Sequence, residues 1–456
     1  MKFLMLLATL CLSVVWPQAV AQTAKATAID TLLTRLHHQQ LFNGAIVVGQ
    51  KGNILLSKGY GYAHFAKELP FTPDTPADGG SNATTFTAAA MLMLAQQHQL
   101  SLLDSVQQYV QYPYTHTSLW NLLTHSTGGL PDYDYYFEKL PADEVLSSLS
   151  MLRILNEQKP PLGYAPDTNF SYDTPAFDVA SAVVAQVSGM PYLEFLYTHF
   201  FTPLQMQHSG GRPSLLEQWK TDRAIGYRYQ NGSLQVDDIG DREGFYGGGN
   251  LWFSAADLYR WGQSFYYKPL LDASLIRVIT STVAIKSKVS RLSLGGWYEG
   301  RSRHAHYYWG SVAGFYSFVY WDTQQQFTIA LVSNVSIPQW ARPALTNALI
   351  DALEGRPIPA IKEPQAEKTD PAQWPMLAGT YDTETAGRVT LYLKDTQPFL
   401  QVQTGMEYRL FQVDDKTFYV PGLDWWLSFQ DKQNNIFQTL LWRSSHEQSV
   451  GKRVVE

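Results

Sequence analysis

The order of apolar and polar residues divides the chain into strand-like ends and a helical middle. Residues 44–64, "GAIVVGQKGNILLSKGYGYAH", alternate apolar and small residues around a "KGN" turn, which predicts a β-hairpin. Over residues 85–261 most apolar positions recur at helical spacing, in short segments broken by Pro and Gly. Residues 305–322 and 326–335, rich in aromatic and β-branched residues, predict two strands, followed by a helix that ends at Gly355. Strands on both sides of a helical middle predict one sheet completed by distant segments.

The C-terminal part of the chain has a different pattern. Residues 356–371 are rich in Pro and charge and lack periodicity, which is typical of a linker. From residue 372 to residue 456, short alternating runs separated by turn residues predict an antiparallel β-barrel of about 90 residues. These runs are "GTYDTE", "RVTLYLKD", "FLQVQT", "YRLFQVD", "TFYVPG", "WWLSFQD" and "QTLLWRSS". We therefore expect a main domain over residues 22–355 and a small C-terminal barrel domain.

The N-terminus has the pattern of a secretory signal peptide over residues 1–21. Lys2 precedes an apolar run that ends near Trp16, and a small-x-small triplet ends at Ala21, so cleavage is expected before Gln22. This pattern predicts a periplasmic or secreted protein. The later sequence contains no run of about 18 apolar residues, so we expect no transmembrane helix.

Composition and charge bear on the expected partners. With 456 residues, 45% of them hydrophobic, the chain is long enough for two domains or more. Its formal net charge of −6 becomes −7 when Lys2 leaves with the signal, and no basic run is present. Neither nucleic acid nor an anionic membrane is therefore an expected partner. The single cysteine, Cys11, lies in the signal after Leu10, which is not the small residue that lipoprotein processing favours, so we expect no lipid anchor and no disulfide.

Five stretches together resemble the serine β-lactamase and penicillin-binding-protein-like hydrolases, especially the class C, esterase and D-aminopeptidase branch. They occur in the order and at the spacing of that family, within residues 30–355. The resemblance implies a mixed antiparallel sheet flanked by helices, an α/β sandwich, beside an all-helical domain. The C-terminal tail resembles the lipocalin-like barrel that follows some D-aminopeptidase relatives. The five stretches are residues 79–106, 119–133, 169–196, 245–261 and 307–322.

The first motif of this family concerns Ser81 and Thr84. In the family, Ser-x-x-Lys opens a helix, and residues three apart on a helix share a face, so the lysine amine can help to remove the serine proton. Ser81 stands at the serine position, but Thr84 stands at the lysine position, and its hydroxyl does not titrate near neutral pH. Ser81 is thus either a nucleophile without its usual base or a residue that caps the following helix.

The second motif, Tyr-x-Asn in the family, corresponds to Tyr172, Asp173 and Thr174. Tyr172 is a candidate proton relay, but a tyrosine pKa of about 10 leaves only about one phenol in a thousand ionised at pH 7. In relatives, nearby cations are thought to favour the ionised form. Thr174 replaces the asparagine that orients substrate amides.

The third motif, Lys-x-Gly or His-x-Gly on an edge strand, corresponds to Tyr308, Trp309 and Gly310. The cation is again absent. Trp309 is a candidate substrate-binding residue that narrows the cleft or offers a stacking surface, beside Gly310. The resemblance also implies an oxyanion hole formed by the main-chain N–H groups of Ser81 and Ser311, and main-chain donors survive side-chain changes.

Other candidate residues have structural alternatives. His306 is a candidate replacement base because histidine titrates near neutral pH, although a half-exposed strand histidine is the commoner case. Tyr133, in "PDYDYYF", is a candidate substrate-binding residue on an aromatic lip, or part of a plain surface loop. His125 and the "YGGGN" stretch at 246–250 are expected to be structural. The His304-x-His306 pair has no evident third ligand, so no metal site is expected.

The changed motifs lead to three functional hypotheses. In the first, the hydrolytic centre is impaired and the cleft binds a small molecule or peptide, by resemblance a peptidoglycan-like or D-amino-acid peptide. In the second, the chain is an active acyl-serine hydrolase, an esterase or peptidase, that uses Ser81 with Tyr172 or His306 as base. In the third, it is a scaffold that binds an unknown protein partner through the C-terminal barrel. None of the three requires a cofactor.

Overall fold

The computed structural model describes residues 22–211, 223–230, 233–240, 242–267, 269–285, 288–338, 340–361, 373–383, 387–402, 407–414, 416–420, 425–443 and 448–454. The expected signal peptide, residues 1–21, lies outside the described residues, as does the expected linker from residue 362 onward. The chain forms two compact units, which divide between Ile337 and Pro338. Each unit is described by itself.

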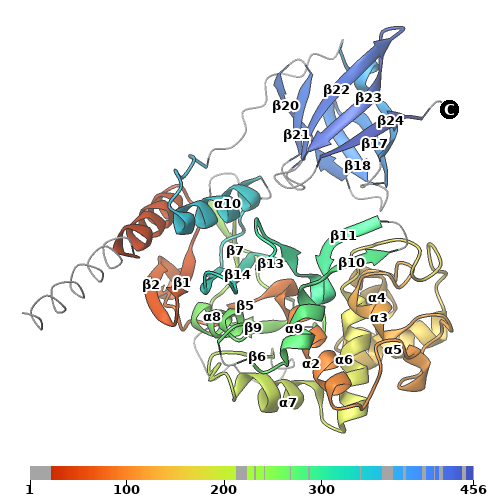
Figure 1. The fold of residues 1–456 in the computed structure, drawn as a ribbon. Helices are drawn as coiled ribbons and strands as arrows, with labels where there is room; N and C mark the ends of the chain where they lie inside the picture. The colour runs from red at the N-terminus through yellow and green to blue at the C-terminus, as the bar shows by residue number, and fades with distance from the viewer. Residues whose placement is uncertain are drawn as a thin grey trace, which may run out of the picture. The chain divides into compact units, whose positions relative to one another are not determined.

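The first unit is built around an eight-stranded antiparallel sheet with strand order β10-β11-β12-β13-β14-β15-β1-β2 (Figure 1). The predicted N-terminal hairpin is confirmed as β1 and β2. β1 pairs with β15 along its whole length, from Gly44 opposite Ser333 to Gln50 opposite Phe327. Distant segments therefore complete one sheet, as the sequence pattern predicted. The strands are β1 (Gly44–Gln50), β2 (Asn53–Tyr60), β10 (Thr282–Ile285), β11 (Lys288–Ser293), β12 (Tyr298–Glu299), β13 (Ala305–Val312), β14 (Phe315–Asp322) and β15 (Phe327–Ser333).

Residues 305–322 form two strands, β13 and β14, where the apolar pattern predicted one. The chain reverses at Ala313, whose φ is 46°, and Gly314. A Cβ atom on Gly314 would lie 2.2 Å from the Tyr227 nitrogen, so only glycine fits at this close approach. The continuous aromatic and β-branched residues on both sides hid the turn.

Helices from the middle of the chain surround α2 (Ala83–Gln96) and confirm the predicted helical region. Residues 83–92 of α2 are all buried, so the helix has no solvent face over its first turns. Phe86 stacks on Trp261 with ring centres 4.2 Å apart. The other helices are residues 22–38, η1 (Phe65–Lys67), η2 (Gly80–Asn82), η3 (Val106–Gln108), α3 (Leu119–Leu123), α4 (Tyr133–Lys139), α5 (Ser148–Gln158), α6 (Pro175–Ser188), α7 (Tyr192–Leu196), η4 (Tyr197–Phe201), α8 (Ala255–Gln263), α9 (Ala273–Thr280) and η5 (Leu294–Gly296).

Within the described ranges, no single helix is long and apolar enough to cross a membrane. Only α6 together with residues 192–201 passes a test of length and composition, as a pair bent by 77°.

Three short sheets complete the first unit. The strand β5 (Ala77–Asp78) pairs with β9 (Leu251–Phe253), which also pairs with β6 (Gly210–Gly211). β5 leads directly into η2 and α2, so this small sheet fixes the chain just before Ser81. The other two pairs are β3 (Tyr62–His64) with β4 (Leu69–Pro70) and β7 (Tyr227–Gln230) with β8 (Ser233–Val236).

The second unit contains α10 (Ala341–Glu354), α11 (Trp374–Leu377) and a nine-stranded antiparallel barrel. α10 ends at Gly355, whose φ is 71°, as the sequence predicted. The strand order β19-β18-β17-β16-β24-β23-β22-β21-β20 begins and ends with strands that are adjacent in sequence, so the barrel is nearly closed. The strands are β16 (Gly379–Thr383), β17 (Gly387–Lys394), β18 (Gln397–Val402), β19 (Glu407–Arg409), β20 (Phe411–Asp414), β21 (Thr417–Val420), β22 (Trp425–Gln433), β23 (Ile436–Arg443) and β24 (Gln448–Arg453).

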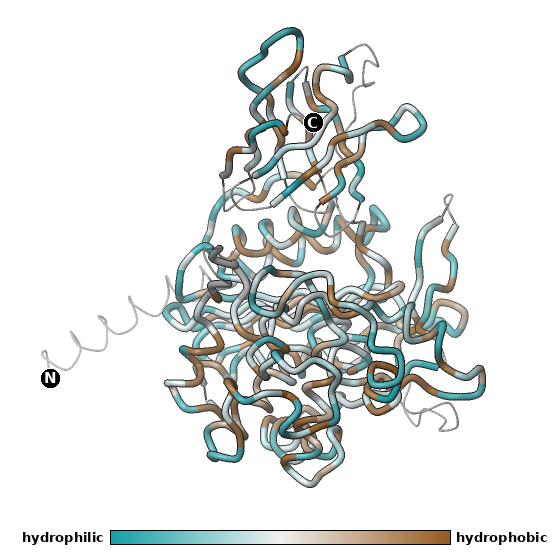
Figure 2. Tube along the Cα trace, turned by 90° about the vertical axis from the view of Figure 1, so that its right-hand side faces the viewer, coloured by the Kyte–Doolittle hydropathy of each residue, from teal (hydrophilic) through white to brown (hydrophobic). Residues whose placement is uncertain are grey.

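The barrel has two more strands than the runs in the sequence. The run "YRLFQVD" splits into β19 and β20 at Leu410, whose side chain is buried and whose N–H donates to Pro398 O. β24 reads "QSVGKR" and is too polar to show an apolar alternation. Elsewhere hydrophobic and hydrophilic positions alternate along the barrel strands (Figure 2), and the inner ones form a core that includes Tyr381, Phe418 and Leu440.

Candidate active site

Ser81 lies in the middle of η2, directly before α2. The turn is held from the residue before it, because the Gly80 N–H donates to the buried Asp78 carboxylate at 2.7 Å. The N-cap residue of α2 is Asn82, and no side chain caps the helix there. The alternative in which Ser81 caps this helix is therefore wrong.

Two glycines bring the main chain at Ser81 against β13. Gly80 has a φ of 52°, and a Cβ atom there would lie 2.7 Å from the Ser311 nitrogen. A Cβ atom on Gly310 would lie 2.1 Å from Gly79 O and 2.9 Å from the Ser81 nitrogen. The main-chain nitrogens of Ser81 and Ser311 therefore flank one close contact between η2 and β13. Two neighbouring main-chain N–H donors are what an oxyanion hole requires.

The side chains at the three motif positions form one chain of hydroxyl groups. Thr84 is fully buried, and its Oγ1 lies 2.9 Å from both Ser81 O and Gly295 O and 3.3 Å from Tyr308 Oη. Tyr308 Oη lies 3.0 Å from Tyr172 Oη. The Ser81 hydroxyl in turn lowers the pKa of the Tyr172 phenol by hydrogen bonding, which makes the two side chains neighbours. We call Thr84, Tyr308, Tyr172 and Ser81 the hydroxyl chain.

Counting protons shows which acceptors stand at the Thr84 end of the hydroxyl chain. A hydroxyl has one proton to donate and lone pairs that accept. The two main-chain carbonyls at 2.9 Å are closer to Thr84 than Tyr308 is, so the Thr84 O–H donates to a carbonyl. In the longer 3.3 Å contact with Tyr308 Oη, Thr84 is again the donor. Either phenol of the Tyr172–Tyr308 pair can donate to the other. The hydroxyl chain thus ends at carbonyl oxygens, which take up no proton near neutral pH.

Burial raises the pKa of both phenols in the hydroxyl chain. Tyr308 is 1% exposed, and desolvation raises its pKa well above 10, to which a charged Tyr172 would add. Desolvation also raises the pKa of Tyr172, and its hydrogen bonds with Ser81 and Tyr308 act against this rise. The effect on Tyr172 is moderated by solvent, because the residue is 43% exposed. No cation is among the described groups that shift either pKa, so both phenols are neutral at pH 7.

Tyr133 is half-buried and packs against the interior. Its phenol donates to Asp178 Oδ2 at 2.7 Å, and its ring stacks on Phe245 with centres 4.2 Å apart. Thr174, at the asparagine position of the second motif, lowers the pKa of the same phenol by hydrogen bonding. Tyr133 and Thr174 therefore belong to the surroundings of Asp178 and have no described contact with Ser81.

Asp178 on α6 anchors the glycine-rich stretch 246–250. Its carboxylate is fully buried and accepts the N–H of Gly247 at 2.8 Å and of Gly248 at 3.3 Å. A Cβ atom on Gly247 would lie 2.1 Å from Phe177 O, so the stretch packs directly on the main chain of α6. Burial raises the pKa of Asp178 to about 7. This stretch is a structural turn.

Asp173, which directly follows Tyr172, has a similar structural role. Its buried carboxylate accepts the Thr127 hydroxyl, the Leu130 N–H at 3.4 Å and the Ala176 N–H at 3.2 Å. Burial raises its pKa to about 7. It therefore joins the segment after α3 to the first turn of α6. We call Asp173, Asp178 and the groups that donate to them the carboxylate network.

His125 packs against the ring of Tyr172 and accepts a hydrogen bond from the next residue. Its Nδ1 accepts the Asp173 N–H at 2.9 Å, and its ring stacks on Tyr172 with centres 4.7 Å apart. Burial lowers the pKa of His125 to about 4, so the ring is neutral at pH 7. This arrangement agrees with the structural role expected for His125.

His306 and Trp309 do not join the hydroxyl chain. His306 Nε2 lies 3.1 Å from Thr280 O, its ring stacks on Trp321, and burial lowers its pKa to about 4. Side chains alternate along β13, so Trp309 points to the opposite face from Tyr308. Its ring stacks on Tyr316 with centres 6.4 Å apart. In the part of the chain that the structure describes, no group of three or more His, Cys, Asp or Glu is placed to hold a metal ion.

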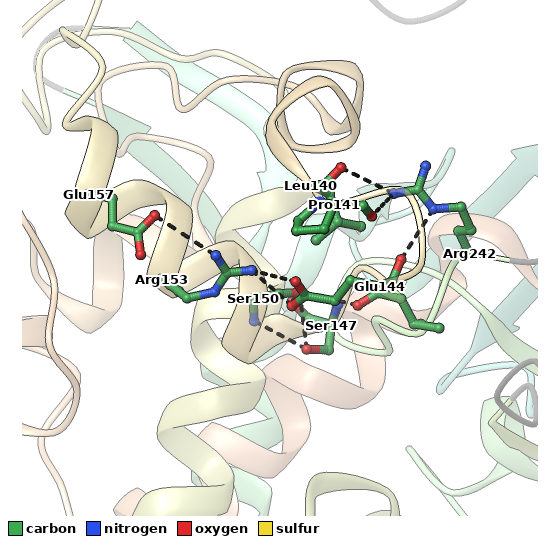
Figure 3. A network of polar contacts seen from close by, with 9 residues as sticks. Leu140, Pro141, Glu144, Ser147, Ser150, Arg153, Glu157 and Arg242 are labelled. Atoms are coloured by element: carbon green, nitrogen blue, oxygen red, sulfur yellow. Dashed lines mark hydrogen bonds and ion pairs between the residues drawn. The ribbon is translucent and has the colours of Figure 1, made fainter.

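Two arginines fix the loop between α4 and α5 (Figure 3). Arg153 on α5 pairs with Glu144 at 2.8 Å and with Glu157 at 3.8 Å. Arg242 crosses to the same loop and donates to the main-chain oxygens of Leu140, Pro141 and Glu144. The loop is thereby tied to the segment that precedes Phe245, which fixes the end of α4, the helix that begins with Tyr133.

A family model described as "Beta-lactamase" matches residues 28–354. The chain belongs to this family. The matched residues include the hydroxyl chain, the oxyanion candidates and the carboxylate network, so this Beta-lactamase-family protein is serine hydrolase-like in fold and motif order, with altered side chains at the motif positions.

Several known proteins resemble large parts of the chain at low identity. Penicillin-binding protein 4* of Bacillus subtilis (strain 168) is 21% identical over 419 residues, 88% of this chain and 92% of that protein. Protein flp of Staphylococcus aureus (strain MW2) is 25% identical over 323 residues, 68% of this chain and 63% of that protein. The octameric penicillin-binding protein homologue from Pyrococcus abyssi has a TM-score of 0.64 at 18% identity and covers 92% of this chain and 99% of its own. SurE has a TM-score of 0.63 at 19% identity and covers 95% and 100%. These structural likenesses show the fold.

Sequence reasoning missed the carboxylate network of this Beta-lactamase-family site. Asp178 lies within the largely apolar run of α6, and a charged residue in such a run is a sign of a buried, hydrogen-bonded role. Its partners Gly247 and Tyr133 are distant in sequence, so no local pattern joins them. The structure brings together Ser81, Thr84, Tyr172 and Tyr308, with Ser311 and Gly310 at the main chain.

Proposed function

We propose that this protein binds a ligand beside Ser81 and does not form an acyl-serine intermediate by the lysine-assisted route of its family. One observation carries this proposal: the hydroxyl chain that begins at Ser81 ends at the carbonyls of Ser81 and Gly295. Such a chain orders the serine proton but offers no group that can accept it.

The size of the expected loss follows from the role of a general base. Proton transfer to a positioned base is worth about 10²–10⁴ in rate. Members of a catalytic unit act together, so the loss of one member can cost nearly as much as the loss of all. Here both cation positions, Thr84 and Tyr308, carry neutral groups, and Tyr172 has no described cation to favour its phenolate.

The ligand that we propose is a peptidoglycan-like or D-amino-acid peptide. The names of relatives support this class: the Teichoic acid D-alanine hydrolase of Staphylococcus aureus (strain MRSA252) is 27% identical over 230 residues, 50% of this chain and 55% of that protein. SurE has also been solved with D-Leu, at a TM-score of 0.58 and 17% identity. The closeness of the Ser81 and Ser311 main chains supports a pair of N–H donors for a carbonyl group of such a ligand. The signal-like pattern of residues 1–21 supports a location in the periplasm or outside the cell.

Intact-mass spectrometry of the mature protein tests the proposal. The protein is incubated at pH 7 with a fluorophosphonate and, separately, with a penicillin, beside Ser81→Ala. We expect no stoichiometric adduct on the folded wild-type protein. An adduct that disappears in Ser81→Ala would show an activated serine and overturn the proposal.

A second candidate function is an active acyl-serine hydrolase in which Tyr172 is the base. The side-chain hydrogen bond between Ser81 and Tyr172 favours this alternative over one that uses His306, which is bonded to Thr280. In that case Tyr172→Phe would abolish the adduct while His306→Phe would leave it.

A further inference from the structure

Gln22 directly follows the expected cleavage site and begins the helix over residues 22–38. Ile29, Leu32 and Leu36 are buried, so the middle and the end of this helix pack into the first unit. The first turn differs, because Gln22 is only half-buried and the next two residues are exposed. Cleavage before Gln22 therefore leaves a glutamine with a free α-amine at the accessible start of a packed helix.

We propose that Gln22 is a modification site, at which the mature N-terminus cyclises to pyroglutamate. In this step the uncharged α-amine nitrogen bonds to Cδ of its own side-chain amide, the Cδ–Nε2 bond breaks, and ammonia leaves with one proton from the amine. The step needs no oxidant and no second reactant. The chain loses about 17 Da and the positive charge of its terminus. The inference rests on the cleavage predicted from the sequence and goes beyond the ligand proposed at Ser81.

The structure leaves both reacting groups of Gln22 available. The N–H groups of the first helical turn have no carbonyl partner within the helix, so conversion of the amine to a lactam breaks no helical hydrogen bond. Among the residues that the structure describes, none forms a hydrogen bond with the Gln22 side chain. The amide carbon is therefore not held away from the amine by a polar contact.

The charges around the first turn favour an uncharged terminus. The start of a helix carries partial positive charge, so an α-ammonium group there is unfavourable. Lys25 lies three residues further on the same face and adds a second positive charge, whose pKa burial lowers. Residues 22–29 contain no acid, and the first acid of the helix, Asp30, is paired with Lys58 at 2.6 Å. Cyclisation removes a charge that has no acidic partner in the first two turns of its own helix.

Intact-mass spectrometry of the exported protein tests the proposal. The full chain is produced with residues 1–21 in a secreting bacterial host, purified and incubated near pH 8, where about half or more of an α-amine is uncharged. We expect a mass about 17 Da below that of residues 22–456, with the loss in the N-terminal peptide. Gln22→Ala is the matched control, since it keeps the small-x-small triplet but has no side-chain amide, and it should show its full calculated mass.

A second readout identifies the lactam itself. Loss of ammonia can also occur at asparagine residues, so the change in mass has to be assigned to the N-terminal peptide. Pyroglutamyl aminopeptidase removes only this cyclic residue. It should expose Thr23 as the new terminus of the denatured wild-type protein and leave Gln22→Ala unchanged.

Two results would overturn the inference, and they differ from each other. A wild-type mass equal to that of residues 22–456 would show cleavage without cyclisation. A chain that begins at another residue, or that keeps residues 1–21, would contradict the cleavage on which the inference rests. Neither result changes the labelling expected at Ser81, so the inference and the proposed function fail separately.

Discussion

Tyr172 and Asp173 are neighbours in sequence but belong to two different polar networks. Tyr172 lies in the hydroxyl chain, where each member is neutral and the last acceptors are main-chain carbonyls. Asp173 lies in the carboxylate network, where buried acids accept N–H and O–H groups from loops that are far apart in sequence. The two acids of the carboxylate network are buried, whereas the hydroxyl chain reaches solvent at Tyr172. Only the carboxylate network contains groups with a pKa near 7.

The two networks have different roles in this Beta-lactamase-family fold: one stabilises the structure around the site, and the other lies at the motif positions. The carboxylate network joins α6 to the segment after α3 and to the stretch 246–250, so it stabilises the frame around the site. The hydroxyl chain includes Thr84 and Tyr308, which stand where the family has cations. It holds these side chains in place but provides no acceptor for the Ser81 proton. Ionisable carboxylates therefore stabilise the surrounding structure, and no cation stands at Thr84 or Tyr308, the two cation positions of the motifs.

The largest expected effect comes from a substitution at Gly310, which tests the close main-chain contact between η2 and β13. In Gly310→Ala, the new Cβ atom would lie 2.1 Å from Gly79 O and 2.9 Å from the Ser81 nitrogen, both in the main chain. We expect a loss of about 3 kcal/mol or more in the free energy of unfolding, measured by urea denaturation. Gly249→Ala is the control, because its Cβ would meet only Phe245 at 3.6 Å and should change stability little. Equal effects of the two substitutions would show that η2 does not pack on β13 as described.

Asp178→Asn tests the carboxylate network through the pH dependence of the free energy of unfolding. The pKa of Asp178 is about 7 in the folded protein and 3.8 ordinarily, so the folded protein binds more protons between these values. The wild-type protein therefore gains stability from Asp178 as the pH falls from 7.5 to 4.5, by up to about 3 kcal/mol. Asparagine cannot take up this proton and lacks the gain.

The measurement is urea denaturation of both proteins at the two pH values. His125 and His306, whose pKa values burial lowers to about 4, act in the opposite direction in both proteins and cancel in the difference. The same pH dependence with and without Asp178 would show that this carboxylate is not buried and protonated as described.

A double substitution should convert the hydroxyl chain into a chain with a base. Thr84→Lys alone should have little effect, because the Tyr308 phenol, 3.3 Å from Thr84 Oγ1, occupies the space that a lysine side chain needs. Thr84→Lys with Tyr308→Ser removes this obstacle and should raise the rate of Ser81 labelling by a fluorophosphonate about 100-fold. Time-resolved intact-mass spectrometry gives the rates. A full gain from Thr84→Lys alone would contradict the role assigned to Tyr308.

The smallest expected difference lies between two tyrosine-to-phenylalanine substitutions. Tyr133→Phe leaves the Asp178 carboxylate short of one donor and should cost about 1.5 kcal/mol of unfolding free energy. Tyr308→Phe removes a hydroxyl whose partners, Thr84 and Tyr172, are neutral, and should cost less than about 1 kcal/mol. Thermal and urea unfolding compare them. If Tyr133→Phe instead weakened ligand binding without a loss of stability, the substrate-binding role predicted for Tyr133 would be supported.

The sequence predicted the fold and the motif positions because both depend on local patterns. The hairpin over residues 44–64, the helical middle and the helix that ends at Gly355 follow from apolar periodicity and turn residues. Ser81, Thr84, Tyr172 and Tyr308 were found through the order and spacing of family motifs, and the structure joins their hydroxyl groups.

The remaining features depend on contacts that no local pattern contains. The turn at Ala313 and Gly314 lies between two equally apolar strands, and β24 is too polar to show alternation. The hydrogen bond of Tyr133 to Asp178 joins distant segments, so the sequence could not choose between an aromatic lip and a plain surface loop. The alternation of β13 does indicate that Trp309 and Tyr308 face opposite sides, and this signal was available in the sequence.

The rate of Ser81 labelling as a function of pH tests the central claim most directly. The mature protein is treated with a fluorophosphonate between pH 6 and pH 10, and adduct formation is followed by intact-mass spectrometry beside Ser81→Ala. Because no group in the hydroxyl chain ionises below about pH 10, we predict slow labelling that rises continuously with pH and reaches no plateau. A plateau with a midpoint between pH 6 and pH 8, absent in Ser81→Ala, would reveal a working base at Ser81 and contradict the account.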